Sequence, residues 1–147
     1  MTNKLSVNAE ATTAASPQAI WALVANANTY ATWGPWNAAC YVPPATGPSQ
    51  VGMTQLFAYG RSTKSQERIL EVETDRRIVY TVEKGIPVKN YRAEVLLTPT
   101  PDGGTHLKWS ATWDRTLLGK IVHRKLATLY PEIVAALIKG AEDQKVG

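Results

Sequence analysis

The sequence predicts an α+β domain: a curved, seven-stranded antiparallel sheet with two short helices and a long C-terminal helix across its concave face. Three observations carry this prediction. Strand patterns follow one another through the middle of the chain, short turns join them, and the last part of the chain changes to a helical period. A chain of 147 residues can bury one sizeable core and is short for two ordinary domains. We therefore expect a single domain over residues 1–147.

The N-terminal part predicts one strand and two short helices. Lys4–Thr13 alternates weakly between apolar and polar side chains, as strands do. Ser16 can cap a helix that begins at Pro17, because proline is tolerated at the first helical position. Thr29–Trp33 can form a second short helix, which the following Gly-Pro pair would end.

Six further strands are predicted in the central sequence. They cover Trp36–Val42, Met53–Tyr59, Thr63–Thr74, Ile78–Lys84, Val88–Thr98 and Thr105–Trp113. An Asp-Gly-Gly turn between the last two is a hairpin signal. Because such short connections join antiparallel neighbours, we expect a meander rather than βαβ units.

The C-terminal sequence predicts one amphipathic helix of about 27 residues, spanning roughly 40 Å at 1.5 Å per residue. Its apolar side is formed by Leu118, Val122, Leu126, Leu129, Ile133 and Leu137. We expect a kink at Pro131, which lacks a backbone N–H. A single helix cannot fill the hollow of a curved sheet from end to end, so a cavity is expected beneath it.

The aromatic residues suggest what lines that cavity. The chain has five tryptophans and six tyrosines but one phenylalanine. Indole and phenol groups combine an apolar ring with a polar atom, which suits a wall shared by core and ligand. The expected ligand-binding residues are Trp33, Trp36, Phe57, Tyr59, Tyr80, Tyr91, Trp109, Trp113, Leu126 and Tyr130. Trp33 and Trp36 could shape the cavity mouth or only seal the sheet edge.

Three residues are candidates for catalysis, each with a structural alternative. His123 could exchange a proton with a bound carbonyl near neutral pH, or it could bond to solvent or a loop. The Tyr91 hydroxyl could orient a carbonyl or be an ordinary core group. The alternation of apolar and polar residues is interrupted on the strand that contains Glu67, so the Glu67 side chain could lie on either face of the sheet. Arg92 and Glu94, by contrast, alternate with apolar neighbours and should face solvent.

Composition and motifs argue against several other classes. The net charge of +4 is modest, and the basic run at 120–125 is typical of a solvated helix face rather than a nucleic-acid site. Cys40 is the only cysteine and only two histidines occur, so we expect no disulfide, metal or cofactor. No GxSxG, HExxH or GxGxxG motif occurs. The start of the chain lacks a long apolar run, so we expect a cytoplasmic protein without a signal peptide or integral membrane association, and leave a homodimer open.

Several segments of the sequence, which together cover nearly the whole chain, resemble one known superfamily. They are SPQAIWALVANANTYATWGPW, then ERILEVETDRRIVYTVEKGIPVKNYRAEVLLTP, then GGTHLKWSATW and the terminal helix. They are similar to the START-type helix-grip superfamily (SRPBCC), in its polyketide cyclase/dehydrase branch. The glycine-rich loop of the pollen-allergen branch is missing, and Gly85-Ile86-Pro87 could cap an entrance.

The resemblance implies a ligand and leaves three functions open. We expect binding or transport of a small hydrophobic or aromatic molecule, such as a lipid, polyketide or quinone-like compound. The first alternative is a cyclase or dehydrase that uses Tyr, His or Glu groups in the cavity. The second is an adaptor for a protein or a membrane surface that uses the basic last helix.

Overall fold

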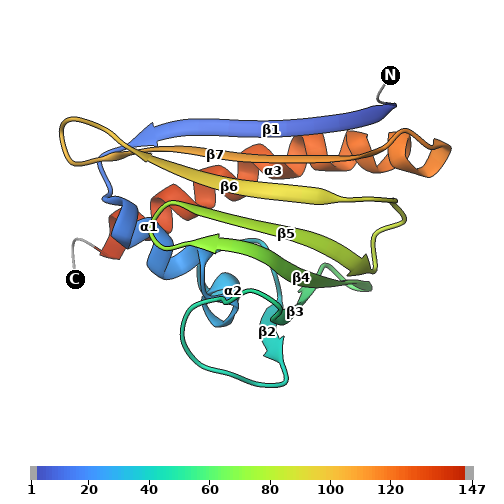
Figure 1. Ribbon diagram of the computed structural model, residues 1–147, viewed down its shortest axis with the longest axis horizontal. Helices are drawn as coiled ribbons and strands as arrows, with labels where there is room; N and C mark the ends of the chain where they lie inside the picture. The colour runs from blue at the N-terminus through green and yellow to red at the C-terminus, as the bar shows by residue number, and fades with distance from the viewer. Residues whose placement is uncertain (1–2, 145–147) are drawn as a thin grey trace.

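Seven antiparallel strands form one curved sheet in the computed structural model, which describes residues 3–144 (Figure 1). Their order across the sheet is β1-β7-β6-β5-β4-β3-β2, a meander closed at one edge by the first strand. The strands are β1 (Lys4–Thr13), β2 (Ala38–Val42), β3 (Thr54–Tyr59), β4 (Thr63–Glu73), β5 (Arg77–Lys84), β6 (Arg92–Pro99) and β7 (Thr105–Asp114). The predicted α+β architecture is confirmed.

Three strands begin later than the sequence predicts, and the one predicted from Met53 begins only one residue later, at Thr54. The strand predicted from Val88 begins at Arg92, because Asn90 takes a left-handed φ of 57° that interrupts an extended chain. The strand predicted from Trp36 begins at Ala38. The Trp36 ring lies so close over Gly34 that a Cβ there would be 2.2 Å from it. The segment before β2 is therefore a tight aromatic turn rather than a strand.

The short helices lie together between β1 and β2. Ser16 caps α1 (Pro17–Val24), and its Oγ accepts a hydrogen bond from Ala19 N at 3.1 Å. A 3₁₀ turn, η1 (Ala27–Thr29), precedes α2 (Tyr30–Trp33). The predicted second helix is thus divided, with Thr29 in the 3₁₀ turn.

The long helix α3 (Leu117–Asp143) crosses the sheet from the end of β7 towards α1 (Figure 1). Thr116 caps it by accepting a hydrogen bond from Gly119 N at 2.9 Å. The helix continues through Pro131, and the bend expected there stays a prediction. One residue of the predicted apolar stripe is placed differently: Leu118 is 54% exposed, because it lies in the open wall of a cavity rather than against the sheet.

The most deeply buried apolar residues of α3 lie near its C-terminal end. Leu137 and Ala141, in the last turns of α3, are fully buried and belong to the same cluster as Ile20 and Val24 of α1. Figure 1 shows α1 beside the C-terminal end of α3, away from the start of that helix. The cavity described below is lined by residues 118–133 of α3.

Candidate ligand-binding cavity

A cavity of about 600 Å³ opens between the first half of α3 and the concave side of β3, β4 and β5. This volume is within the range of small-molecule sites. Its walls consist of Tyr30, Trp36, Phe57, Tyr59, Thr63, Ser65, Glu67, Tyr80, Gly85, Ile86, Pro87, Tyr91, Trp109, Leu118, Ile121, Val122, Lys125, Leu126, Thr128, Leu129, Tyr130, Glu132 and Ile133. Most of these side chains are apolar or aromatic, and the charged ones are few.

One wall is a cluster of aromatic rings. The Tyr30 ring lies 4.8 Å from Trp36 and 5.0 Å from Phe57, centroid to centroid. The Tyr30 hydroxyl donates to the Val24 carbonyl at 2.6 Å, which fixes the ring against α1. Tilted rings at these separations attract one another through their quadrupoles. The wall is therefore rigid before any ligand arrives.

A second wall gathers tyrosine hydroxyls. Tyr91 and Tyr130 are hydrogen-bonded to each other through their hydroxyls. Trp109 Nε1 donates to the Tyr80 hydroxyl at 3.0 Å, and the Tyr80 ring lies 6.4 Å from that of Tyr91. Burial raises the pKa of Tyr80, Tyr91 and Tyr130 above that of a free phenol, and the neighbouring phenols raise it further at Tyr80 and Tyr91. These groups are neutral at physiological pH and can donate a hydrogen bond.

Glu67 contributes a carboxyl group to the same cavity. Glu67 lies on the same face of β4 as Thr63 and Ser65, and the side chains of all three line the cavity. Gln55, its cross-strand neighbour on β3, is buried and donates to Glu67 Oε1 through Nε2 at 3.1 Å.

The surroundings of Glu67 change its protonation. Burial raises the pKa of the carboxyl to about 8, and the hydrogen bond from Gln55 opposes only part of that increase. The residue itself is half-buried because the cavity reaches its carboxyl. At neutral pH the group is largely a neutral acid that can donate a hydrogen bond to a guest.

Three of the predicted site residues do not line the cavity. His123 Nε2 donates to the Ser6 carbonyl of β1 at 2.9 Å. His123 is therefore a histidine at the edge of the helix, outside the cavity wall. Trp113 is fully buried and donates to the Gly119 carbonyl at 3.0 Å. Trp33 stands behind Trp36, where it donates to Thr29 Oγ1 at 3.1 Å and packs against α3 at Gly140. In each of these three residues, a ring N–H donates a hydrogen bond to a protein group outside the cavity.

The other predicted residues are brought together around the cavity, and the prediction missed some of its neighbours. Lining it are Trp36, Phe57, Tyr59, Glu67, Tyr80, Tyr91, Trp109, Leu126 and Tyr130. Tyr30 was missed, although it is one of only six tyrosines and comes three residues before Trp33. Lys125 and Glu132 were also missed. Their spacing of seven residues, two helical turns, is a signal that could have placed them on one side of α3.

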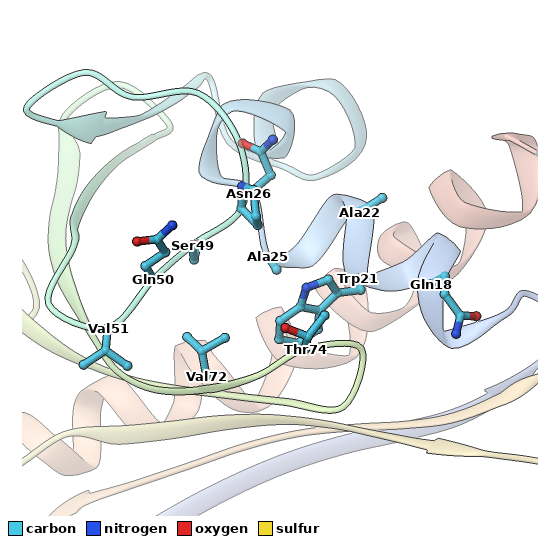
Figure 2. Close-up of a pocket in the computed structure, with 11 residues that line it drawn as sticks. Gln18, Trp21, Ala22, Ala25, Asn26, Ser49, Gln50, Val51, Val72 and Thr74 are labelled. Atoms are coloured by element: carbon cyan, nitrogen blue, oxygen red, sulfur yellow. The ribbon is translucent and has the colours of Figure 1, made fainter.

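A second hollow, also about 600 Å³, lies outside the core between α1, residues 48–51 and the end of β4. Figure 2 shows Trp21 and Gln18 on one side of it and Gln50 and Val51 on the other. No charged side chain lines this groove, and it holds no group comparable to Glu67. The cavity under α3 is therefore the candidate site.

Two kinds of feature are absent from residues 3–144. No group of three or more histidine, cysteine, aspartate or glutamate side chains is arranged to hold a metal ion. Within the same residues, no helix is long and apolar enough to cross a membrane.

A family model described as "Polyketide cyclase / dehydrase and lipid transport" matches residues 4–142. The chain belongs to this family. No curated protein matches the chain. The family's sequence model thus covers both the sheet and the long helix that enclose the cavity.

Several solved structures share the fold of this polyketide cyclase/dehydrase family member. A protein from Nitrosospira multiformis is 18% identical with a TM-score of 0.78, over 97% of this chain and 100% of that one. A protein from Thermobifida fusca is 22% identical with a TM-score of 0.74, over 94% and 93%. The protein XoxI from Bacillus cereus is 19% identical with a TM-score of 0.72, over 99% of both chains. At these identities the likeness shows a common fold.

Proposed function

We propose that the protein binds and carries a small, mainly apolar, aromatic molecule in the cavity under α3. The observation that carries this proposal is the cavity itself, which has a volume of about 600 Å³ and is walled largely by apolar and aromatic side chains. The family description, which includes lipid transport, supports the same kind of ligand. The cytoplasmic location and the homodimer considered from the sequence stay predictions.

The apolar walls supply most of the binding free energy. A guest that loses about 400 Å² of apolar surface gains roughly 10 kcal/mol at about 25 cal/mol per Å². Association costs on the order of 4–15 kcal/mol, which offsets much of that gain. We therefore expect dissociation constants in the micromolar range without a covalent step.

The polar groups of the cavity select the guest. Neutral Glu67 and the tyrosine hydroxyls are donors directed at an otherwise apolar volume. Donors of this kind favour a molecule with one or two carbonyl or hydroxyl oxygens. A polyketide or quinone-like compound fits this description better than a saturated hydrocarbon chain.

A tryptophan that fills the cavity tests the location of binding. Ser65 is a small, half-buried residue in the wall of the cavity, and Ala22 is a small residue in the wall of the second groove. We expect Ser65→Trp to weaken binding of the neutral probe N-phenyl-1-naphthylamine about tenfold or more, because it removes the volume that the probe needs. Fluorescence titration measures the affinity.

Ala22→Trp is the matched control and should bind the probe as the wild type does. Loss of binding in Ala22→Trp together with full binding in Ser65→Trp would place the ligand in the groove instead. Native mass spectrometry of freshly purified protein would then identify a natural ligand by its mass.

The second candidate function is an enzyme of the cyclase or dehydrase type. It is favoured by one observation: an acid with a pKa of about 8 shares the cavity with the hydrogen-bonded hydroxyls of Tyr91 and Tyr130. Such an acid can give a proton to a carbonyl or enolate oxygen and take one back. Turnover of a poly-β-ketone that falls in Glu67→Gln and Tyr91→Phe, while probe binding persists, would establish catalysis. If the wild type binds the poly-β-ketone without turning it over, the carrier function is supported instead.

A further inference from the structure

The cavity mouth carries apolar side chains that no other described residue covers. In the first turns of α3, Leu117 is 78% exposed, Leu118 54% and Ile121 52%. At 3.6 residues per turn, Leu117 lies on the side of the helix opposite buried Leu126, and Ile121 lies between that side and the cavity, which it lines. A helix packed on a sheet normally presents polar residues on that side. A cluster of exposed apolar residues of this kind is typical of an interaction site.

Positive charge surrounds these apolar residues. From residue 115 to residue 125 the chain has four basic side chains and no aspartate or glutamate. They are Arg115, Lys120, Arg124 and Lys125. None of the four forms a salt bridge with any residue of the described chain. This short segment alone carries as much positive charge as the net charge of the whole protein, which is +4.

The opposite rim of the mouth has the same character. Ile86 and Pro87 line the cavity from the loop between β5 and β6, and Lys84 and Lys89 are exposed on either side of them. This loop and the start of α3 lie at the same end of the sheet (Figure 1). Apolar residues between cations therefore border the mouth on two sides.

We propose that the cavity mouth docks on an anionic lipid bilayer. Leu117, Leu118 and Ile121 would enter the boundary between headgroups and acyl chains, and the surrounding lysines and arginines would contact lipid phosphates. In this orientation the cavity opens towards the membrane, so an apolar guest can pass between bilayer and protein without crossing water. The inference concerns where the protein works, and it holds whichever guest the cavity binds.

Co-sedimentation with lipid vesicles tests the proposal. The vesicles are phosphatidylcholine with a minority of phosphatidylglycerol, or phosphatidylcholine alone. We expect the wild type to sediment with the anionic vesicles and much less with the neutral ones, and added salt should release it. Leu117→Asp and the double variant Lys120→Glu/Arg124→Glu should each lower the partition about tenfold.

These variants separate docking from ligand binding and from folding. Leu117, Lys120 and Arg124 do not line the cavity, so binding of N-phenyl-1-naphthylamine should persist. Leu117 is also the first residue of α3, where an aspartate is compatible with the helix dipole. Val51→Asp is the matched control: Val51 is 64% exposed but lies in the groove of Figure 2, and this variant should sediment as the wild type does.

Two results would overturn the proposal. The first is a wild type that remains in the supernatant with anionic vesicles. The second is a Leu117→Asp variant that sediments fully; if this variant also elutes later than the wild type in size-exclusion chromatography, the patch is assigned to contact with a second copy of the chain.

Discussion

At the scale of single residues, Glu67 has the least ordinary environment in the cavity. Its carboxyl lies among aromatic side chains and has one hydrogen-bond donor, Gln55, from the protein. The surface carboxylates of the convex side behave in the opposite way. Glu71 bonds Arg77 and Arg92, and these guanidinium groups hold its pKa below the usual value. Because the pKa of the Glu67 carboxyl is raised, the group keeps its proton at neutral pH and can donate a hydrogen bond to a guest.

Glu67 should make the stability of the protein fall as pH rises. Its pKa is about 8 in the folded state and near 4.5 in an ordinary environment, so between these values the folded state binds the extra proton. Ionisation therefore favours unfolding across this window and has its full effect above pH 8. We expect Glu67→Gln to match the wild type near pH 4.5 and to be more stable by roughly 2–4 kcal/mol at pH 9. Urea denaturation at the two pH values measures the difference.

An equal gap between the two proteins at both pH values would contradict this prediction. The same titration affects ligand binding. A guest that accepts a hydrogen bond from Glu67 should bind the wild type more weakly above pH 8, and Glu67→Gln should remove that dependence.

At the scale of elements, the loop between β5 and β6 is shaped by its first residue. Gly85 has a φ of 99°, which L side chains rarely adopt, and a Cβ there would be 1.8 Å from the Lys64 carbonyl oxygen. This close approach holds the loop against the beginning of β4. Ile86 and Pro87 consequently stay at the cavity mouth.

Gly85→Ala should therefore cost more stability than an alanine at an ordinary turn glycine. We expect a loss of about 2–4 kcal/mol, because both the backbone conformation and the contact with Lys64 are disturbed. Gly60→Ala is the control. Gly60 also has a positive φ, 64°, but an added Cβ would meet nothing within 4 Å, so we expect about 1 kcal/mol. Thermal melting compares the two; similar losses would remove the special role of Gly85.

At the scale of the whole molecule, the interface between helix and sheet is divided into a packed half and a hollow half. Leu137 is fully buried in the packed half. Leu126, eleven residues earlier on the same helix, lines the cavity. The deepest packing is thus near one end of α3, and the cavity lies nearer the other.

Truncating these two leucines should separate the two roles. Leu137→Ala leaves a closed void and should cost about 3–4 kcal/mol with little effect on probe binding. Leu126→Ala enlarges a space that is already open, so we expect about 1–2 kcal/mol and a clearly weaker probe affinity. Chemical denaturation and fluorescence titration provide the two measurements. Equal destabilisation by both changes would mean that the hollow half is packed after all.

Without any structure, local patterns were enough to predict the order of helices and strands, the meander and the cap at Ser16. Periodicity and capping depend on neighbouring residues, so a linear sequence records them. Strict alternation also put Glu94 on the outer face, where it accepts a hydrogen bond from Arg77 at 2.5 Å. The residues of the cavity wall could be predicted where they stood on regular strands, as Tyr80 and Trp109 do.

Tertiary structure decided what local patterns leave open. Glu67 shares one face of β4 with Thr63 and Ser65, and only the packing of the sheet against α3 makes this face the cavity wall. The Ser6 carbonyl accepts a hydrogen bond from the His123 ring, and the Gly119 carbonyl accepts one from Trp113. Such partners lie far along the chain or around a turn, so their distance is known only once the chain has folded. The volume of the cavity also depends on the tertiary structure, because it is the space that the packed side chains of helix and sheet leave unfilled.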